Sequence, residues 1–215
     1  MSEKLRWGIL GTGMIAKKFA GDLPSTETGV LSATASRTQA SADAFAADFG
    51  GQAIVGYGNL LADPEVDAIY LSLPNGLHAE WSIRALEAGK HVLCEKPIAR
   101  SEAEAATIFE AAERTGQIVV EAFMYRTMPG VQRVLEVVHS GEIGELRLIR
   151  LNFTFDREVS LTDARYQVEH GGGSIMDVGC YCTNFARALA QVEPTGVHAI
   201  AHLHESGVDD YAAGT

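Results

Sequence analysis

The first half of the chain alternates between two patterns of hydrophobic and polar positions. Short, nearly continuous apolar runs, such as residues 68–71, are typical of strands buried on both faces of a parallel sheet. Segments with helical spacing separate these runs. We predict strands over residues 5–10, 30–36, 52–55, 67–73, 91–94 and 118–122, and helices over residues 14–22, 40–48, 76–88 and 102–115. This order predicts a doubly wound α/β fold over residues 1–123.

The second half follows a different pattern. We predict a helix over residues 129–139, a strand over 144–155, a helix over 174–190 and a strand over 197–204. Long strands separated by loops indicate an α+β domain over residues 124–215, with an open, mostly antiparallel sheet. Residues 211–215 resemble the start of a further strand, which would leave the edge of the sheet without a partner. We therefore expect the chain to be a piece of a longer protein, truncated at its C-terminus.

A glycine-rich segment with the pattern G-x-G-x-x-A follows the first predicted strand. We predict that Gly11 makes a tight turn, that Gly13 lets the backbone approach a phosphate, and that Ala16 packs the helix on its strand. The positive end of that helix would then face a pyrophosphate. A tight turn without a ligand is the alternative. The second strand, about one βαβ unit later, favours dinucleotide binding.

Composition narrows the range of partners. The chain has 17 basic and 28 acidic residues, a net charge of −11, and 47% hydrophobic residues. This negative charge argues against nucleic acid and anionic membranes, because both attract a basic surface. No apolar run is long enough to span a bilayer. The first predicted strand begins at residue 5, so we expect no signal peptide and a cytoplasmic protein. Cys94, Cys180 and Cys182 lack zinc-type spacing and are expected to be reduced thiols.

One candidate catalytic segment lies just after the fifth predicted strand. It consists of Glu95, Lys96 and Pro97. Ligands of open parallel sheets bind at the carboxyl ends of the strands, so Lys96 is a candidate catalytic or cofactor-binding cation. A surface lysine in a turn is the alternative.

A second candidate segment begins with three glycines at residues 171–173 and continues into a helix. Asp177, Tyr181 and Asn184 are spaced i, i+4 and i+7, which places them on one helix face. If this face is buried, each side chain needs a hydrogen-bond partner. A solvated helix side is the alternative.

Together, these segments resemble the glucose–fructose oxidoreductase, inositol dehydrogenase and MocA family of NAD(P)-dependent oxidoreductases. The resemblance rests on the glycine-rich segment at residues 11–16, on residues 95–97, and on the Gly-Gly-Gly…Asp-Val-Gly-Cys-Tyr segment at residues 171–181. Further segments similar to the family are Pro74-Asn75 with His78, and residues 121–126.

The resemblance implies a Rossmann domain followed by a substrate and oligomerisation domain, so we expect a homo-oligomer, a dimer or a tetramer. Lys96 resembles the lysine that lies near the nicotinamide, and Asp177 resembles the acidic residue that orients the substrate. Tyr181 is similar to the tyrosine of the aldose and dihydrodiol dehydrogenase branch. Met128 stands where many relatives have histidine, which weakens any prediction of a particular sugar.

The expected cofactor-binding residues are Gly11, Thr12, Gly13, Met14, Ile15, Ser36, Arg37, Thr38, Pro74, Asn75, His78, Glu95 and Lys96. The expected substrate-binding residues are Arg126, Arg165 and Asn184, and no metal is expected.

Oxidising an alcohol needs a hydride acceptor and a base for the hydroxyl proton, and the three catalytic candidates, Lys96, Asp177 and Tyr181, could supply the base. A free phenol has a pKa of about 10, which is too high for a base at neutral pH. A neighbouring ammonium group favours the phenolate. We therefore predict that Tyr181 is the acid/base and that Lys96 lowers its pKa and polarises the substrate oxygen. Asp177 would bind the substrate hydroxyl or hold Lys96.

The end of the second predicted strand indicates NADP. An NAD enzyme usually has Asp or Glu at this place, where it binds the ribose hydroxyls. This chain has Ser36, Arg37 and Thr38 instead. A guanidinium beside two hydroxyls suits a 2′-phosphate, so NAD is the less favoured cofactor. A solvent-facing arginine is the alternative.

These features predict an NADP-dependent oxidoreductase that transfers hydride between nicotinamide and a carbinol carbon of a sugar or cyclic diol. Aldose 1-dehydrogenase or dihydrodiol dehydrogenase activity is expected. One alternative is a non-catalytic NADP-binding regulator of the same fold, although the three catalytic candidates favour catalysis. Another is a piece that binds the cofactor without activity. His198, His202 and His204 share a strand face without interleaved carboxylate or thiolate ligands, which favours an exposed or interface surface over a metal site.

Overall fold

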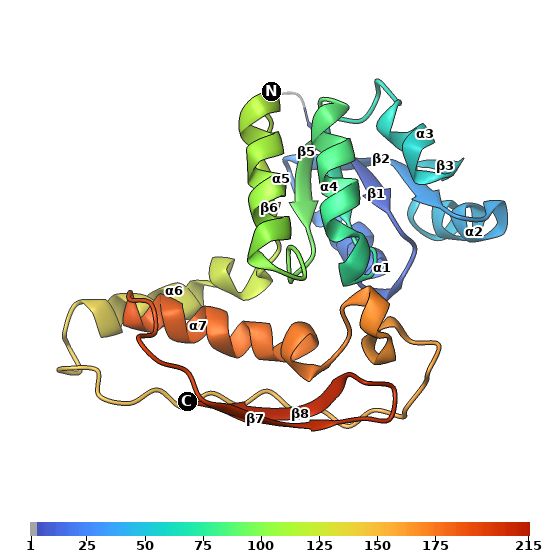
Figure 1. The fold of residues 1–215 in the computed structure, drawn as a ribbon. Coiled ribbons are helices and arrows are strands. Elements are labelled where there is room, and N and C mark those ends of the chain that lie inside the picture. The colour runs from blue at the N-terminus through green and yellow to red at the C-terminus, as the bar shows by residue number, and fades with distance from the viewer. Residues whose placement is uncertain (1–3) are drawn as a thin grey trace. The chain divides into compact units, whose positions relative to one another are not determined.

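The structure is a computed structural model that describes residues 4–215 (Figure 1). The chain divides into two compact units, the first ending at Ala122 and the second spanning Phe123–Thr215. The first unit is built around a parallel sheet. The second combines two helices with a short antiparallel sheet.

The parallel sheet of the first unit has six strands in the order β3-β2-β1-β4-β5-β6. The strands are β1 (Leu5–Leu10), β2 (Gly29–Ser36), β3 (Gln52–Val55), β4 (Ala68–Leu71), β5 (His91–Cys94) and β6 (Val119–Glu121). The strand order reverses direction at β1, which pairs with both β2 and β4. In doubly wound folds this reversal marks the crevice where ligands bind, at the carboxyl ends of the strands.

Helices cover both faces of this sheet. They are α1 (Met14–Asp22), α2 (Gln39–Phe49), α3 (Tyr57–Leu61), α4 (His78–Glu87) and α5 (Glu102–Thr115), with short 3₁₀ turns η1 (Leu23–Ser25) and η2 (Asn75–Leu77). Because successive strand side chains point to opposite faces, Ile9 and Leu10 enter different hydrophobic clusters. One cluster packs under α1 and α2, and the other under α4 and α5, which lie side by side in Figure 1.

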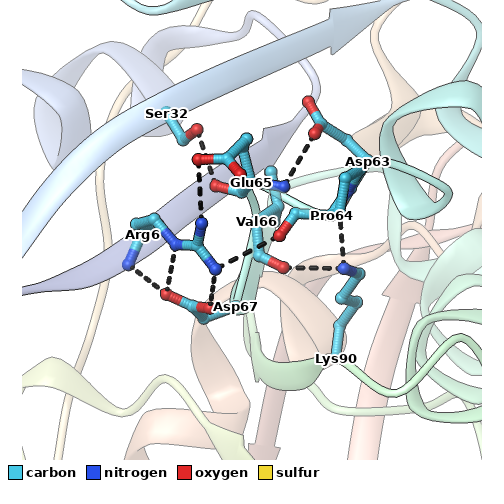
Figure 2. A network of polar contacts seen from close by, with 8 residues as sticks. All are labelled: Arg6, Ser32, Asp63, Pro64, Glu65, Val66, Asp67 and Lys90. Carbon is cyan, nitrogen blue, oxygen red and sulfur yellow. Dashed lines mark hydrogen bonds and ion pairs between the residues drawn. The ribbon is translucent and has the colours of Figure 1, made fainter.

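The amino-terminal edge of the sheet is tied together by two cations, as Figure 2 shows. Arg6 on β1 donates from Nε to Asp67 Oδ2 at 3.0 Å and from Nη2 to Asp67 Oδ1 at 2.6 Å. Its Nη1 donates to Glu65 Oε2 at 2.9 Å. Lys90, just before β5, donates to the carbonyl oxygens of Asp63 and Val66, both at 2.7 Å. These contacts join β1 and β5 to the segment that leads into β4.

The second unit contains α6 (Pro129–His139) and α7 (Cys180–Ala190), which run side by side (Figure 1). A π-helical turn, η6 (Ile175–Gly179), leads directly into α7. The unit also contains 3₁₀ turns η3 (Met124–Thr127), η4 (Ala164–Tyr166) and η5 (Val168–His170). Its sheet is an antiparallel pair of β7 (Ala199–Leu203) and β8 (Asp209–Gly214).

The predicted fold class is confirmed, with a doubly wound parallel sheet followed by an α+β unit. The predicted strand over residues 144–155 is wrong, because these residues lie in neither sheet. A strand needs a hydrogen-bonded neighbour, and within the described residues the second sheet consists of β7 and β8 without a third strand. Leu148 in this segment is 68% exposed, whereas the ring of Phe153 packs against that of Tyr181.

Two smaller differences concern helices. The predicted helix over residues 174–190 is split into the π-helical turn η6 and the α-helix α7. The short helix α3 was not predicted, because five residues are too few to establish a helical period. Over residues 4–215, none of the helices has the length and apolar character needed to cross a bilayer.

Candidate functional site

The first glycine-rich segment has the backbone that the sequence predicts. Gly11 has a φ of +103°, and its N–H donates to the Ala35 carbonyl at 3.0 Å. A Cβ at Gly11 would lie 3.1 Å from Ser72 Oγ, so a side chain there would be both strained and crowded. Ala16 is fully buried between α1 and the sheet. The segment therefore holds the start of α1 tightly against β1.

The N-terminus of α1 is open to a ligand. Gly13 is the N-cap, no side chain caps the helix, and its first turn carries no acidic residue. A Cβ at Gly13 would meet no heavy atom within 4 Å. Met14 and Ile15 beside it are 75% and 37% exposed. Uncapped N–H groups and the positive helix end together suit an anion such as a pyrophosphate.

The end of β2 places one cation at the same edge of the sheet. Arg37 is exposed and Ser36 is buried. Thr38 caps α2, since its Oγ1 accepts a hydrogen bond from the N–H of Ser41 at 3.3 Å. Burial raises the pKa of Tyr57, and the nearby charge of Arg37 partly opposes this shift. Among residues 36–38, Arg37 is thus the group best suited to a phosphate.

The backbone around Lys96 is held by two carboxylates of the first unit. Glu95 Oε1 accepts a hydrogen bond from the Tyr70 hydroxyl at 2.5 Å, and Glu95 Oε2 accepts one from the Lys96 N–H at 3.3 Å. Glu121 Oε1 accepts one from the Ile98 N–H at 2.8 Å. These contacts fix the chain on both sides of Lys96, just beyond the carboxyl end of β5.

His78, the first residue of α4, is fully buried beneath this edge. Its Nδ1 lies 2.8 Å from the Pro97 carbonyl oxygen, and its Nε2 lies 2.7 Å from the Leu73 carbonyl oxygen. Burial lowers the pKa of His78. Both ring nitrogens therefore face the backbone of the first unit. Pro74 and Asn75, which precede His78, are half-buried.

In the second unit, two expected site residues form an ion pair. Arg165 Nε donates to Asp177 Oδ2 at 2.7 Å, and Arg165 Nη1 lies 3.3 Å from Asp163 Oδ1. Burial acts to lower the pKa of Arg165, but the carboxylates of Asp177 and Asp163 outweigh it and raise the pKa. Asp177 is thus paired with a cation of its own unit.

Two of the three glycines before Asp177 allow close approach of other parts of the unit. A Cβ at Gly172 would lie 2.4 Å from the Arg165 carbonyl oxygen. Gly173 has a φ of +110°, and its Cβ would lie 2.1 Å from Asp209 Oδ1. Asp209, on β8, accepts a hydrogen bond from the Ile175 N–H at 2.8 Å. The glycines therefore let β8 fasten the start of the π-helical turn.

Tyr181 lies in an aromatic cluster of the second unit. Its ring centroid is 5.3 Å from that of Phe123 and 5.5 Å from that of Phe153. The Tyr125 hydroxyl donates to Asn184 Oδ1 at 2.5 Å. A cavity of about 170 Å³ adjoins this cluster. Its lining consists of Tyr125, Leu151, Asn152, Phe153, Tyr181, Cys182 and Phe185.

The predicted common face of Asp177, Tyr181 and Asn184 assumes a regular α-helix, but Asp177 lies in the wider π-helical turn. Asp177 pairs with Arg165, whereas Asn184 pairs with Tyr125. Arg126, Tyr125's neighbour in η3, is exposed. Lys96 belongs to the first unit, and Asp177 and Tyr181 belong to the second.

His202 on β7, and His198 and His204 on either side of this strand, form no metal-type cluster in the described part of the chain. His202 Nδ1 lies 2.7 Å from Asp210 Oδ1. Within residues 4–215, no group of three or more His, Cys, Asp or Glu side chains is arranged to hold a metal ion.

Two family models match the chain over most of its length. Residues 5–123 match the model described as "Oxidoreductase family, NAD-binding Rossmann fold". The chain belongs to this family. Residues 131–215 match the GFO/IDH/MocA C-terminal domain. The family expected from the sequence is therefore confirmed.

Named members of the GFO/IDH/MocA family resemble this chain over nearly all of its length. It is 38% identical to D-xylose 1-dehydrogenase (NADP(+)) 2 of Haloferax volcanii, over 98% of this chain and 65% of that protein. It is 35% identical to trans-1,2-dihydrobenzene-1,2-diol dehydrogenase of Mus musculus, over 96% of this chain and 62% of that protein.

A solved structure is similar in fold. It is that of KijD10, a 3-ketoreductase from Actinomadura kijaniata in complex with NADP and TDP-benzene. The TM-score is 0.90 and the identity 33%, over 98% of this chain and 65% of that one. The chain thus spans less than two thirds of the length of these relatives.

Several residues that hold the candidate site residues within each unit were not predicted from the sequence. They are Tyr70, Glu121, Asp163 and Asp209. Glu121 and Asp209 accept hydrogen bonds from backbone N–H groups that are 23 and 34 residues away in the sequence. One signal could have pointed to Glu121, since it lies one residue before the end of the predicted strand over residues 118–122, which follows the predicted strand before Lys96.

Proposed function

We propose that this chain carries the NADP-binding and catalytic residues of an oxidoreductase that acts on a carbinol carbon of a sugar or cyclic diol. The observation that carries the proposal is the uncapped, glycine-lined N-terminus of α1, at the same sheet edge as Arg37 and Lys96. Relatives named as an NADP-linked xylose dehydrogenase and a dihydrodiol dehydrogenase support the reaction class. The NADP in the KijD10 complex supports the cofactor.

In this proposal, separate segments of the first unit bind separate parts of NADP. The N–H groups at the start of α1 would bind the pyrophosphate, with Gly13 leaving room for it. Arg37 would bind the 2′-phosphate as a planar fork. The segments at residues 74–75 and 95–96 would contact the nicotinamide half. When bound, the cofactor supplies the hydride acceptor or donor for the reaction.

The proposed chemistry divides the work among three side chains. Tyr181 takes the proton of the substrate hydroxyl at its phenolate oxygen and returns it in the reverse direction. The Lys96 ammonium lowers the pKa of Tyr181 and polarises the substrate oxygen. Asp177 is already paired with Arg165, so we assign it to orienting the substrate rather than to taking the proton.

The two units receive different roles in this proposal. Residues 1–123 would bind the dinucleotide, and residues 124–215 would bind substrate and contribute to a homo-oligomer interface in the cytoplasm. Ile200 and Leu203 on β7 are 62% and 64% exposed, and Leu148 is 68% exposed. Exposed apolar side chains in one unit favour such an interface.

The test is a turnover screen of the full-length protein with NADP⁺ against aldoses, inositols and trans-dihydrodiols, followed at the absorbance of the reduced nicotinamide. We expect turnover with at least one class. Tyr181→Phe should lower kcat by about 10²–10⁴-fold while leaving NADPH binding unchanged. Tyr166→Phe, a tyrosine change elsewhere in the second unit, is the matched control and should leave kcat unchanged.

Two outcomes contradict the proposal. NADPH binding without turnover on any substrate class would favour a non-catalytic regulator. Failure to bind either NADPH or NADH would reject the cofactor assignment.

A further inference from the structure

His78 joins two loops at the carboxyl edge of the sheet. One loop follows β4 and contains Leu73, whose carbonyl oxygen lies 2.7 Å from His78 Nε2. The other follows β5 and contains Pro97, the residue after Lys96, whose carbonyl oxygen lies 2.8 Å from His78 Nδ1. The ring is fully buried, its contact with Leu73 is buried and its contact with Pro97 is part-buried.

The backbone around Lys96 is not held by strand hydrogen bonds, because its N–H groups donate to side chains instead. The Lys96 and Ile98 N–H groups donate to Glu95 and Glu121 carboxylates. Neither N–H group takes part in the pairing of β5 with β4 and β6, which ends at Cys94. The Pro97 carbonyl between them can only accept, its contact with His78 is part-buried, and a carbonyl withdrawn from water without a donor is costly.

We propose that His78 is a positioning residue for Lys96, with its Nδ1–H donating to the Pro97 carbonyl. A ring N–H donated from Nδ1 to a backbone carbonyl is a common way for a protein to fix a histidine tautomer. The inference rests on the proposed role of Lys96 in catalysis. His78 itself acts through the backbone and does not touch substrate.

The charges nearest the ring act in opposite directions. The carboxylate of Glu95 favours the protonated imidazole, whereas burial and the ammonium of Lys96 disfavour it. The neutral ring carries one proton and can donate to only one of its two carbonyl neighbours. In our assignment this proton is on Nδ1, and Nε2 donates to Leu73 only when the ring is doubly protonated.

Replacing His78 with asparagine or with glutamine tests its two hydrogen-bond contacts separately. The amide nitrogen of asparagine takes up the place of Nδ1, and that of glutamine takes up the place of Nε2. His78→Asn can therefore still donate to Pro97, whereas His78→Gln can donate only to Leu73. A role confined to core packing would make the two variants alike.

The first readout does not depend on activity. Hydrogen exchange of the peptide covering residues 94–101 should be faster in His78→Gln and close to wild type in His78→Asn. The second readout is kcat, which should fall by about 10- to 100-fold in His78→Gln, with little change in the KM for NADP, and recover in His78→Asn. His91→Gln is the matched control. His91 accepts a hydrogen bond from the Ile118 N–H at the opposite edge, so this change should leave both readouts unaltered.

Each outcome decides the inference. Equal exchange and equal kcat in the two variants would overturn it. If hydrogen exchange differs between the two variants but even the wild type shows no turnover, the hydrogen bond from His78 to Pro97 is supported and the proposed function is contradicted. If neither variant folds, ¹⁵N NMR of the wild-type ring decides: a proton on Nδ1 supports the inference, and a proton on Nε2 alone overturns it.

Discussion

The two edges of the parallel sheet use charged residues in opposite ways. At the amino-terminal edge, Arg6 and Lys90 donate to carboxylate and carbonyl oxygens of the segment before β4, which binds three strands together (Figure 2). At the carboxyl edge, Arg37 is exposed, and the α1 N-terminus has no side-chain cap. Arg6 and Lys90 thus bind groups of the fold, whereas Arg37 and the start of α1 are open to solvent.

This difference shows which charged residues to change for stability and which for function. Both edges have the same strands and share the same hydrophobic clusters, so the sheet itself cannot explain the contrast. The loops explain it, because in parallel α/β sheets ligands bind at the carboxyl ends of the strands. Substitutions at the two edges should therefore affect different measurements.

The largest effect is expected for Lys96→Met at the carboxyl edge. Loss of the ammonium should lower kcat by about 10²–10⁴-fold, because in the proposed mechanism Lys96 stabilises the phenolate of Tyr181. NADPH binding and the melting temperature should change little. Lys90→Met at the amino-terminal edge is the control, which should lower the melting temperature and leave kcat largely unchanged. Turnover of Lys96→Met near the wild-type rate would contradict the proposed catalytic role of Lys96.

The next effect concerns the choice of cofactor. Arg37→Ala should raise the KM for NADP by about 10- to 100-fold, because a charged hydrogen bond contributes about 1.5–3 kcal/mol. The KM for NAD should stay nearly constant. Arg100→Ala removes another exposed arginine, one that pairs with Glu104, and should alter neither constant. Equal changes in both KM values would contradict the NADP assignment.

The smallest effect is a pH-dependent stability at the amino-terminal edge. The hydrogen bonds from Arg6 outweigh burial and lower the pKa of Asp67 from 3.8 to about 2. A lowered carboxyl pKa stabilises the fold above pH 3.8, and this contribution is lost as the pH falls towards 2. Asp67 is 32% exposed, so after allowance for solvent screening we expect only about 1 kcal/mol.

The measurement is urea unfolding of the wild type and Asp67→Asn across this range. The difference in free energy of unfolding should be constant at higher pH and shrink as the pH approaches 2. Glu65→Gln removes a carboxylate that is 73% exposed and should show a much smaller difference. A gap between wild type and Asp67→Asn that stays unchanged with pH would show that the ion pair does not stabilise the fold.

Much of the first unit could be predicted from the sequence because its strands are short apolar runs with clear ends. The predicted ranges for β1, β3 and β5 are those of the structure. Local pattern was enough there, since buried parallel strands need little information from distant residues.

The second unit shows where local pattern is insufficient. Residues 144–155 have strand-like residues, yet pairing depends on a neighbour that no local pattern can supply. The π-helical turn around Asp177 differs from an α-helix by one residue per hydrogen bond, and no regular period reveals it. The contacts of Glu121 and Asp209 depend on chain closure over more than 20 residues.

The close contact of Asp209 with Gly173 limits how the second unit can be divided in a chimera with a relative. The segment bearing Tyr181 is held at its start by a carboxylate from a strand that comes later in the chain, and only a residue without Cβ fits between them. A chimera joined between residues 191 and 198 would take these two partners from different parents. The helix α7 and the β7–β8 hairpin should therefore be exchanged as one block in any chimera of the second unit.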